Sequence, residues 1–234
     1  IDKDAEIVTP IMLNRDTMTE IQLLGVNGEE TGTFTGQLAL AHTYGTGGKD
    51  SCRNTVKAVS NFLFNVQIDH YISLTMDAVE IVNDLVDGVK VKVTDDFSLV
   101  DPSLVMGEEV TLHGSQALTY VRSRANVGEQ TNISRMQRQK EYLAALTEKL
   151  LQYSRESDTF ALKAAIEIGD YMVSDCTSGQ LSDFTNEMAN YEILPFVSIE
   201  GEARKGEFME FYPEKESLQS IVITTFFEEQ ENVQ

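Results

Sequence analysis

Half of the arginines of this chain lie in one short window of the sequence. Four of the eight fall between positions 110 and 140, where Glu129 is the one acidic residue: Arg122, Arg124, Arg135 and Arg138. The chain as a whole is strongly acidic, with 38 Asp and Glu residues against 18 Lys and Arg residues. Because the arginine fork matches two oxygens of a phosphate or carboxylate, the window predicts a site for a multiply charged anion.

The spacing within the window predicts two pairs of side chains that share a face. Arg122 and Arg124 are two residues apart, so they project to one side if the segment is extended. Arg135, Arg138 and Gln139 follow the i, i+3, i+4 pattern of one helix face. The loop between the pairs is short, and the partly positive N-terminus of the helix lies beside it. Such an arrangement suits a diphosphate. The alternative is that these arginines pair with surface carboxylates.

Arg15 and Asp16 follow a buried strand, at a position where α/β folds place functional groups. Arg15 could join a phosphate-binding cluster. Asp16 could hold Mg²⁺ or accept the proton of an attacking hydroxyl. The alternatives are that the two residues form a structural ion pair or that Asp16 only forms a turn. Asp95 and Asp96 could likewise be metal ligands, or they could form a solvated turn.

Other candidates are weaker. The glycine-rich segment 45–48 lacks the Lys-Ser/Thr pair of a P-loop, and Arg53 in the following helix is either a phosphate contact or a surface residue. His42, His70 and His113 are far apart, and none has a second ligand at metal spacing. The sequence contains neither a Gly-x-Ser-x-Gly elbow nor a Cys-x-x-Cys pair, so hydrolase chemistry with a nucleophile of this kind is unsupported.

The elements that position these residues are mixed in order, which predicts an α/β sandwich with a mixed sheet in one domain. We expect strands at 7–13, 21–26, 70–75 and 89–93, a turn at Asn27-Gly28, and a loop at 29–36. An extended segment is expected at 119–123, and a hairpin between 193–199 and 207–212. The apolar periodicity predicts helices at 38–44, 55–64, 76–85, 115–118, 132–153, 159–168, 179–189 and 215–227, followed by an acidic tail at 228–234.

Composition limits the possible partners. A net charge of −20 argues against nucleic acid and against docking on anionic lipid. The sequence has no run of 18 apolar residues, which is the length that a membrane span needs. Cys52 and Cys176 are the two cysteines, and we expect a disulfide between them if the chain is exported.

Four motifs occur in a familiar order: Asn14-Arg15-Asp16-Thr17, the segment 112–118 (LHGSQAL), the segment 120–124 (YVRSR) and the segment 134–139 (SRMQRQ). Together with the helix-to-strand turn at 85–93, they resemble the LytR-CpsA-Psr family. The resemblance covers residues 7–150, whereas residues 160–234 match no motif.

The resemblance implies a membrane-anchored protein on the extracellular face of the bacterial cytoplasmic membrane. Its domain, here residues 1–234, would be a three-layer α/β/α sandwich with a central mixed β-sheet. It would transfer a glycopolymer, such as a teichoic acid or capsular polysaccharide, from a polyprenyl-pyrophosphate carrier to peptidoglycan, with Mg²⁺ as cofactor. The resemblance gives a pyrophosphate-binding role to six residues: Arg15, Arg122, Arg124, Arg135, Arg138 and, as a support, Gln139. Asp16 would be the metal ligand or base.

Two departures from the family pattern matter. Asn132 occupies the position of the family's usual acid, three residues before the first helix arginine. The family also has a metal-binding Asp on a strand that would precede Ile1, so we expect a truncated N-terminal strand and an impaired activity of this chain. The alternative functions are a non-catalytic module that binds polyprenyl pyrophosphate or wall glycan, and a transcriptional attenuator, which the acidic charge disfavours.

Overall fold

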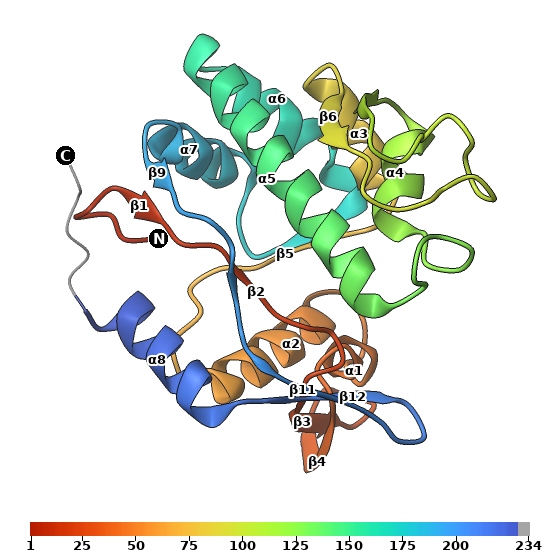
Figure 1. Cartoon of the computed structure of the whole chain (residues 1–234). Coiled ribbons are helices and arrows are strands. Elements are labelled where there is room, and N and C mark those ends of the chain that lie inside the picture. Colours follow the sequence, from red (N-terminus) through yellow and green to blue (C-terminus); the bar gives the residue numbers. More distant parts are fainter. Residues whose placement is uncertain (229–234) are drawn as a thin grey trace. The chain divides into compact units, whose positions relative to one another are not determined.

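The computed structural model describes residues 1–228. The chain forms two compact units, which differ in colour range in Figure 1. The first unit contains Ile1–Ser73, Val173–Cys176 and the described residues from Glu192 onward, and the second contains Leu74–Met172 and Thr177–Tyr191. The expectation that they act as one functional domain stays a prediction. The expected tail at 228–234 lies outside the described residues except for Glu228.

The N-terminal strand of the first unit is interrupted by a proline. The predicted strand at 7–13 forms two short strands, β1 (Ile7–Val8) and β2 (Ile11–Met12), separated by Thr9 and Pro10. Because Pro10 has no backbone N–H to donate, it breaks the ladder. The strands β9 (Glu192–Ile193) and β10 (Val197–Ser198) pair in parallel with β1 and β2, respectively. The segment 193–199 therefore pairs with the N-terminal strands, which corrects the predicted hairpin with 207–212.

The longest hairpin of the first unit joins β3 (Met18–Leu24) to β4 (Glu30–Gln37). Its turn contains the predicted Asn27-Gly28, and Gly28 has a positive φ of 81°, which glycine adopts without strain. The loop expected at 29–36 is wrong, since these residues form β4. That strand is largely exposed and alternates Thr with Gly and Phe, so it lacks the apolar pattern that marks a buried strand.

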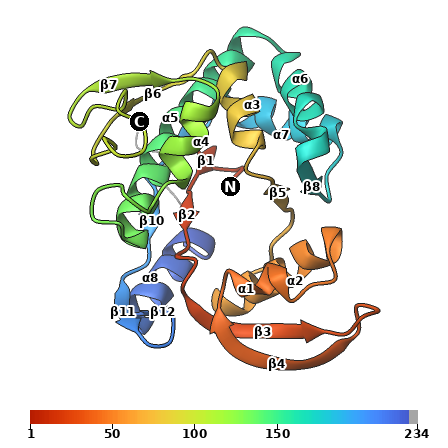
Figure 2. The ribbon, with the colours of Figure 1, turned by 90° about the vertical axis from the view of Figure 1, so that its right-hand side faces the viewer.

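Two helices cover this hairpin, as Figure 2 shows. They are α1 (Leu40–Thr43) and α2 (Gly48–Phe62), and α2 begins at Gly48 rather than at 55. Their shared core consists of the buried side chains of Ile21, Leu38, Ala41 and Ala58. The amide of Asn54, inside α2, donates to the carbonyls of Gln22 and Ala41 at 3.1 and 2.8 Å. This side chain therefore links the helix to both neighbouring segments.

The C-terminal part of the first unit is a hairpin followed by a helix. The hairpin is formed by β11 (Gly201–Lys205) and β12 (Met209–Pro213), so the segment predicted as its loop is one of its strands. The helix α8 (Lys215–Phe226) was predicted. It packs on the end of α2 through a cluster of buried residues: Phe62, Leu63, Val66, Leu218 and Val222.

The second unit is mainly helical. A short antiparallel pair, β6 (Val89–Lys92) and β7 (Glu109–Leu112), packs with five helices: α3 (Ala78–Leu85), α4 (Ser115–Arg122), α5 (Asn132–Glu156), α6 (Phe160–Glu167) and α7 (Ser178–Met188). A 3-10 turn, η1 (Gly169–Tyr171), follows α6. Fully buried residues such as Val89, Phe97, Leu112 and Tyr120 form its core.

Two of the unit boundaries fall within the short strands β5 (Ile72–Leu74) and β8 (Met172–Ser174), which pair with each other, and the other two follow Cys176 and Tyr191. The fold is mixed α/β, as predicted. Among residues 1–228, no helix combines the length and the apolar character that crossing a lipid bilayer requires.

Candidate functional site

The helix α4 extends further than the sequence analysis predicted. It continues through Tyr120 and Val121 to Arg122, and the chain becomes extended only at Ser123. The predicted extended segment at 119–123 is therefore wrong. Ala117, Tyr120 and Val121 are buried, and their i, i+3, i+4 spacing places them on one helix face toward the core. Burial of this face explains why the segment is helical.

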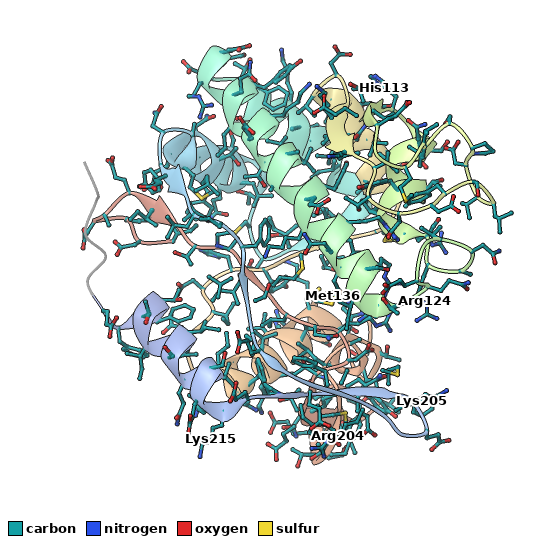
Figure 3. The ribbon with its side chains drawn as sticks, in the orientation of Figure 1. His113, Arg124, Met136, Arg204, Lys205 and Lys215 are labelled. Atoms are coloured by element: carbon teal, nitrogen blue, oxygen red, sulfur yellow. The ribbon has the colours of Figure 1, made fainter. Side chains whose placement is uncertain are left out.

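Arg122 and Arg124 are the exposed arginines of the window. Arg122 is the last residue of α4, and Arg124 follows in the connection to α5, where Figure 3 labels it near the start of that helix. Within residues 1–228, neither guanidinium has a hydrogen-bonding or ion-pair partner. Their forked donors are therefore available to an anion from solution.

Arg138 has a different environment, because its side chain is only 1% exposed. Its Nε donates to the carbonyl oxygen of Tyr120 at 3.2 Å, and a second nitrogen donates to the carbonyl oxygen of Ser123. The third nitrogen forms an ion pair with Asp95. The guanidinium also lies 5.1 Å from the centroid of the Phe97 ring. The donors of Arg138 are thus directed at the protein itself.

The neighbouring side chain of Gln139 completes this arrangement. Its amide donates to the carbonyl oxygen of Val121 at 3.0 Å. The last carbonyls of an α-helix have no partners within the helix, and here Arg138 and Gln139 supply donors to the end of α4. The two residues therefore hold α5 against the turn that carries Arg122 and Arg124.

Asp95 and Asp96 have separate roles in the structure. Asp95 neutralises the buried Arg138, and Gly128 lies against it: a Cβ at Gly128 would be 2.6 Å from the Asp95 carboxylate, and φ is +46° there. Asp96 accepts the backbone N–H of Ser98 at 2.9 Å, a bond that lowers the pKa of its carboxyl. Among the described residues, neither acid belongs to a group of three possible metal ligands.

The start of α5 contains the fourth arginine of the window. Arg135 donates to the side-chain oxygen of Asn132 at 2.6 Å, so a neutral amide occupies the place of an acid. The hydroxyl of Thr131 caps the helix by accepting the N–H of Ser134 at 3.1 Å. This helix end therefore retains its positive charge without a carboxylate in its first turn.

In the first unit, Arg15 and Asp16 lie between β2 and β3. Arg15 is exposed, with its Nε 3.6 Å from the Asp16 carboxylate. That carboxylate also accepts the amide of Gln37 at 3.1 Å, while the backbone N–H of Asp16 donates to the side chain of Asn14 at 3.0 Å. The side chain of Asp16 is held in a turn and is still 14% exposed.

The Asp16 carboxylate fits a magnesium site in which the protein supplies few of the ligands. Mg²⁺ commonly binds one or two carboxylates and completes its coordination with water and substrate phosphates. Asp16 supplies one such carboxylate. The positive charge of Arg15 lowers the affinity for a bare cation, so an anionic ligand would have to accompany the metal.

Arg53 lies on α2 of the first unit. Its side chain is 67% exposed and pairs with Asp50, one helical turn earlier, at 3.0 Å. With Asn54, Lys57 and neighbouring residues of β3 and β4, it lines a small cavity of about 230 Å³. Its assigned role in pyrophosphate binding stays a prediction.

The two cysteines do not form the expected disulfide, and both are free thiols. Cys52 is buried inside α2, with 3% exposure. The Cys176 thiol lies beside Asp175, and the backbone N–H of Cys176 donates to the hydroxyl of Ser174. Each cysteine therefore has its own environment in the first unit.

The chain is similar to one family of known proteins. The model of the LytR_cpsA_psr family matches residues 1–224. TagV of Bacillus subtilis (strain 168), named a polyisoprenyl-teichoic acid–peptidoglycan teichoic acid transferase, is 34% identical over 170 residues, which cover 69% of this chain and 41% of that protein. TagU of Halalkalibacterium halodurans, with the same activity in its name, is 28% identical over 166 residues, covering 71% and 50%. The chain thus spans half or less of the length of these two relatives.

Solved structures show the same fold. The crystal structure of B. subtilis TagV superimposes with a TM-score of 0.73 at 22% identity, covering 96% of this chain and 84% of that one. A structure described as TagT bound to LI-WTA has a TM-score of 0.71 at 20% identity, covering 96% and 79%.

Proposed function

The chain belongs to the LytR-CpsA-Psr family, and we propose that it transfers a wall glycopolymer from a polyprenyl-pyrophosphate carrier to peptidoglycan. Its curated relatives are named polyisoprenyl-teichoic acid–peptidoglycan teichoic acid transferases. The proposal includes the location that such a reaction requires, the outer face of the cytoplasmic membrane.

One observation carries the proposal at the level of residues. Arg122 and Arg124 are exposed without protein partners among residues 1–228, while Arg138 and Gln139 hold the backbone on which they stand. A pyrophosphate offers several oxygens with delocalised negative charge, and two guanidinium groups beside a helix N-terminus match that charge. Holding the donors in place in advance favours catalysis, because no reorganisation is needed when charge develops.

The chemistry assigned to the site is phosphoryl transfer. A hydroxyl oxygen of the peptidoglycan acceptor attacks the phosphorus that bears the glycopolymer, and the bond from that phosphorus to the bridging oxygen breaks. Polyprenyl phosphate leaves, and the acceptor proton passes to a base. We assign Arg122 and Arg124 to the pyrophosphate oxygens, with Arg135 adding positive charge nearby.

Asp16 is the proposed base or metal ligand. Its carboxylate is held by Gln37 and by the turn at Asn14, so it can accept a proton or coordinate a cation without a large rearrangement. Mg²⁺, when bound, would neutralise charge on the phosphate oxygens. Arg15, beside Asp16, would add a forked donor for phosphate oxygens. Arg138 is better placed to position α4 than to contact substrate.

The test is glycopolymer transfer by the complete protein, measured with purified lipid-linked glycan and peptidoglycan in the presence and absence of Mg²⁺. We expect transfer to require Mg²⁺ and to be lost in the Asp16→Asn variant, while that variant retains its affinity for prenyl pyrophosphate. Unaltered turnover in Asp16→Asn would contradict the role of this carboxylate. Tight binding by the wild-type protein without any transfer would instead support a non-catalytic binding module.

A further inference from the structure

Three side chains with metal-binding atoms meet in the first unit, away from the arginine window. His70 comes from the segment before β5, whereas Asp175 and Cys176 follow β8. The Nδ1 atom of His70 lies 3.3 Å from one oxygen of Asp175, and the Cys176 Sγ atom lies 3.7 Å from the other. One ligand atom from each residue lies within 4.8 Å of the other two. Among the described residues, no other group of three or more His, Cys, Asp and Glu side chains has this geometry.

The backbone around these side chains is held by a set of hydrogen bonds. The N–H of Tyr71 donates to the Asp175 carboxylate at 3.1 Å. The hydroxyl of Ser174 donates to the carbonyl oxygen of Tyr71 at 2.8 Å and accepts the N–H of Cys176 at 3.0 Å. Segments about 100 residues apart in the sequence are therefore fastened together at the point where the three side chains meet. The site is largely formed without a ligand.

The spacing of the atoms matches zinc coordination. With Zn–N and Zn–O bonds of about 2.0–2.1 Å at tetrahedral angles, nitrogen and oxygen ligands are about 3.3 Å apart, and a sulfur ligand at about 2.3 Å is roughly 3.6 Å from an oxygen. The separations of 3.3 and 3.7 Å are close to these values, although they run to different oxygens of the Asp175 carboxylate, which would have to turn to offer one oxygen to both neighbours. The ligand atoms of His70 and Cys176 lie within 4.8 Å of each other, and a bound ion would have to shorten this separation.

The donor types narrow the choice of metal. Imidazole, thiolate and carboxylate together favour a transition metal such as Zn²⁺, whereas Mg²⁺ and Ca²⁺ prefer oxygen ligands. Three protein ligands leave one tetrahedral position for water or an external ligand. The alternative is that His70 and Asp175 form only a hydrogen bond that fastens the two segments.

We propose that His70, Asp175 and Cys176 form a binding site for one zinc ion in the first unit. The ion would join the residues before β5 to those after β8 and would stabilise this unit. The proposal does not depend on the transferase function, since none of the three residues belongs to the proposed pyrophosphate site.

Co²⁺ is the probe for this site, because a Co²⁺–thiolate bond gives a charge-transfer absorption band in the near ultraviolet. The reduced, chelator-treated protein is titrated with Co²⁺ and then with Zn²⁺. We expect one equivalent of Co²⁺ to bind with this band and Zn²⁺ to displace it. Zn²⁺ should also raise the Tm of the wild-type protein, because it binds the folded state.

Substitutions separate the proposed ligands from other side chains. Loss of an outer contact to a metal ligand weakens binding about 10–100-fold, so loss of a ligand in Cys176→Ser or His70→Gln should weaken Zn²⁺ binding by roughly 100-fold or more. The Cys176→Ser variant should also lose the cobalt band. The matched controls, Cys52→Ser and His113→Gln, should bind like the wild-type protein.

The far-ultraviolet circular dichroism of the metal-free Cys176→Ser protein checks that it is folded. A cobalt band that persists in Cys176→Ser, or equal Zn²⁺ affinity in this variant and the wild-type protein, would overturn the proposal. So would the absence of a thiolate band when the wild-type protein is titrated.

Discussion

The Nε atom of Arg138 donates to the carbonyl oxygen of Tyr120 at 3.2 Å, which joins the start of α5 to the last turn of α4. The same guanidinium pairs with Asp95 and is 1% exposed. One arginine of the window therefore serves the structure, and it presents Arg122 and Arg124 to solvent. We therefore expect changes at Arg138 to affect stability and changes at Arg122 and Arg124 to affect anion binding.

The buried ion pair should be important for stability. Removal of one partner leaves an uncompensated buried charge, which costs about 3–5 kcal/mol. We expect Asp95→Ala and Arg138→Ala each to lower the free energy of unfolding by about this amount, as measured by urea denaturation. Arg122→Ala is the exposed control and should change it by less than about 0.5 kcal/mol. Equal small effects in all three variants would contradict the structural role of Arg138.

Ionisation of the buried Tyr120 should destabilise the fold at alkaline pH. Burial raises the pKa of Tyr120 to about 12, whereas an unfolded tyrosine has a pKa near 10. Because the folded-state pKa is raised, the stabilisation is complete below about pH 10 and is lost as the pH rises toward about 12. Tyr120→Phe should show a shallower fall of the urea midpoint over this interval. An identical pH dependence in both proteins would contradict this assignment.

The Asn132 amide at the start of α5 should favour anion binding at the expense of helix stability. Asn132→Asp would place a carboxylate in the first turn, beside Arg135, where a negative charge stabilises a helix by about 0.3–1 kcal/mol. The same charge would compete with a bound pyrophosphate. We therefore expect a higher Tm and a higher Kd for prenyl pyrophosphate in the Asp variant. Asn132→Gln, which adds no charge, is the control, and a tighter Kd in Asn132→Asp would be the opposite result.

Much of the fold was predictable where apolar residues recur with a regular period. Both α5 and α2 have such a stripe. The start of α5 was expected where it is observed, whereas α2 was expected only from residue 55 onward. The strands β4 and β11 were missed because they are mostly exposed and polar, and antiparallel pairing rather than burial maintains them. The helical end of α4 was missed because residues 119–123 were expected to be extended, although buried Ala117, Tyr120 and Val121 have helical spacing.

The candidate site was predictable in composition but not in the role of each residue. The density of arginine and the scarcity of acids between 110 and 140 identified the window. The role of Arg138 depends on Asp95, which is 43 residues away in the sequence, and no local pattern indicates this contact. His70 and Asp175 are 105 residues apart, so no short spacing in the sequence indicates that they meet.

The central claim is that Arg122 and Arg124 bind pyrophosphate, and calorimetric titration with a short-chain prenyl pyrophosphate tests it most directly. Hydrogen bonds to charged groups contribute about 1.5–3 kcal/mol each. The Arg122→Ala/Arg124→Ala protein should therefore raise the Kd by roughly 100-fold or more, with an unchanged Tm, whereas the control Arg204→Ala should bind like the wild-type protein. A double variant that binds prenyl pyrophosphate as tightly as the wild-type protein would contradict the account.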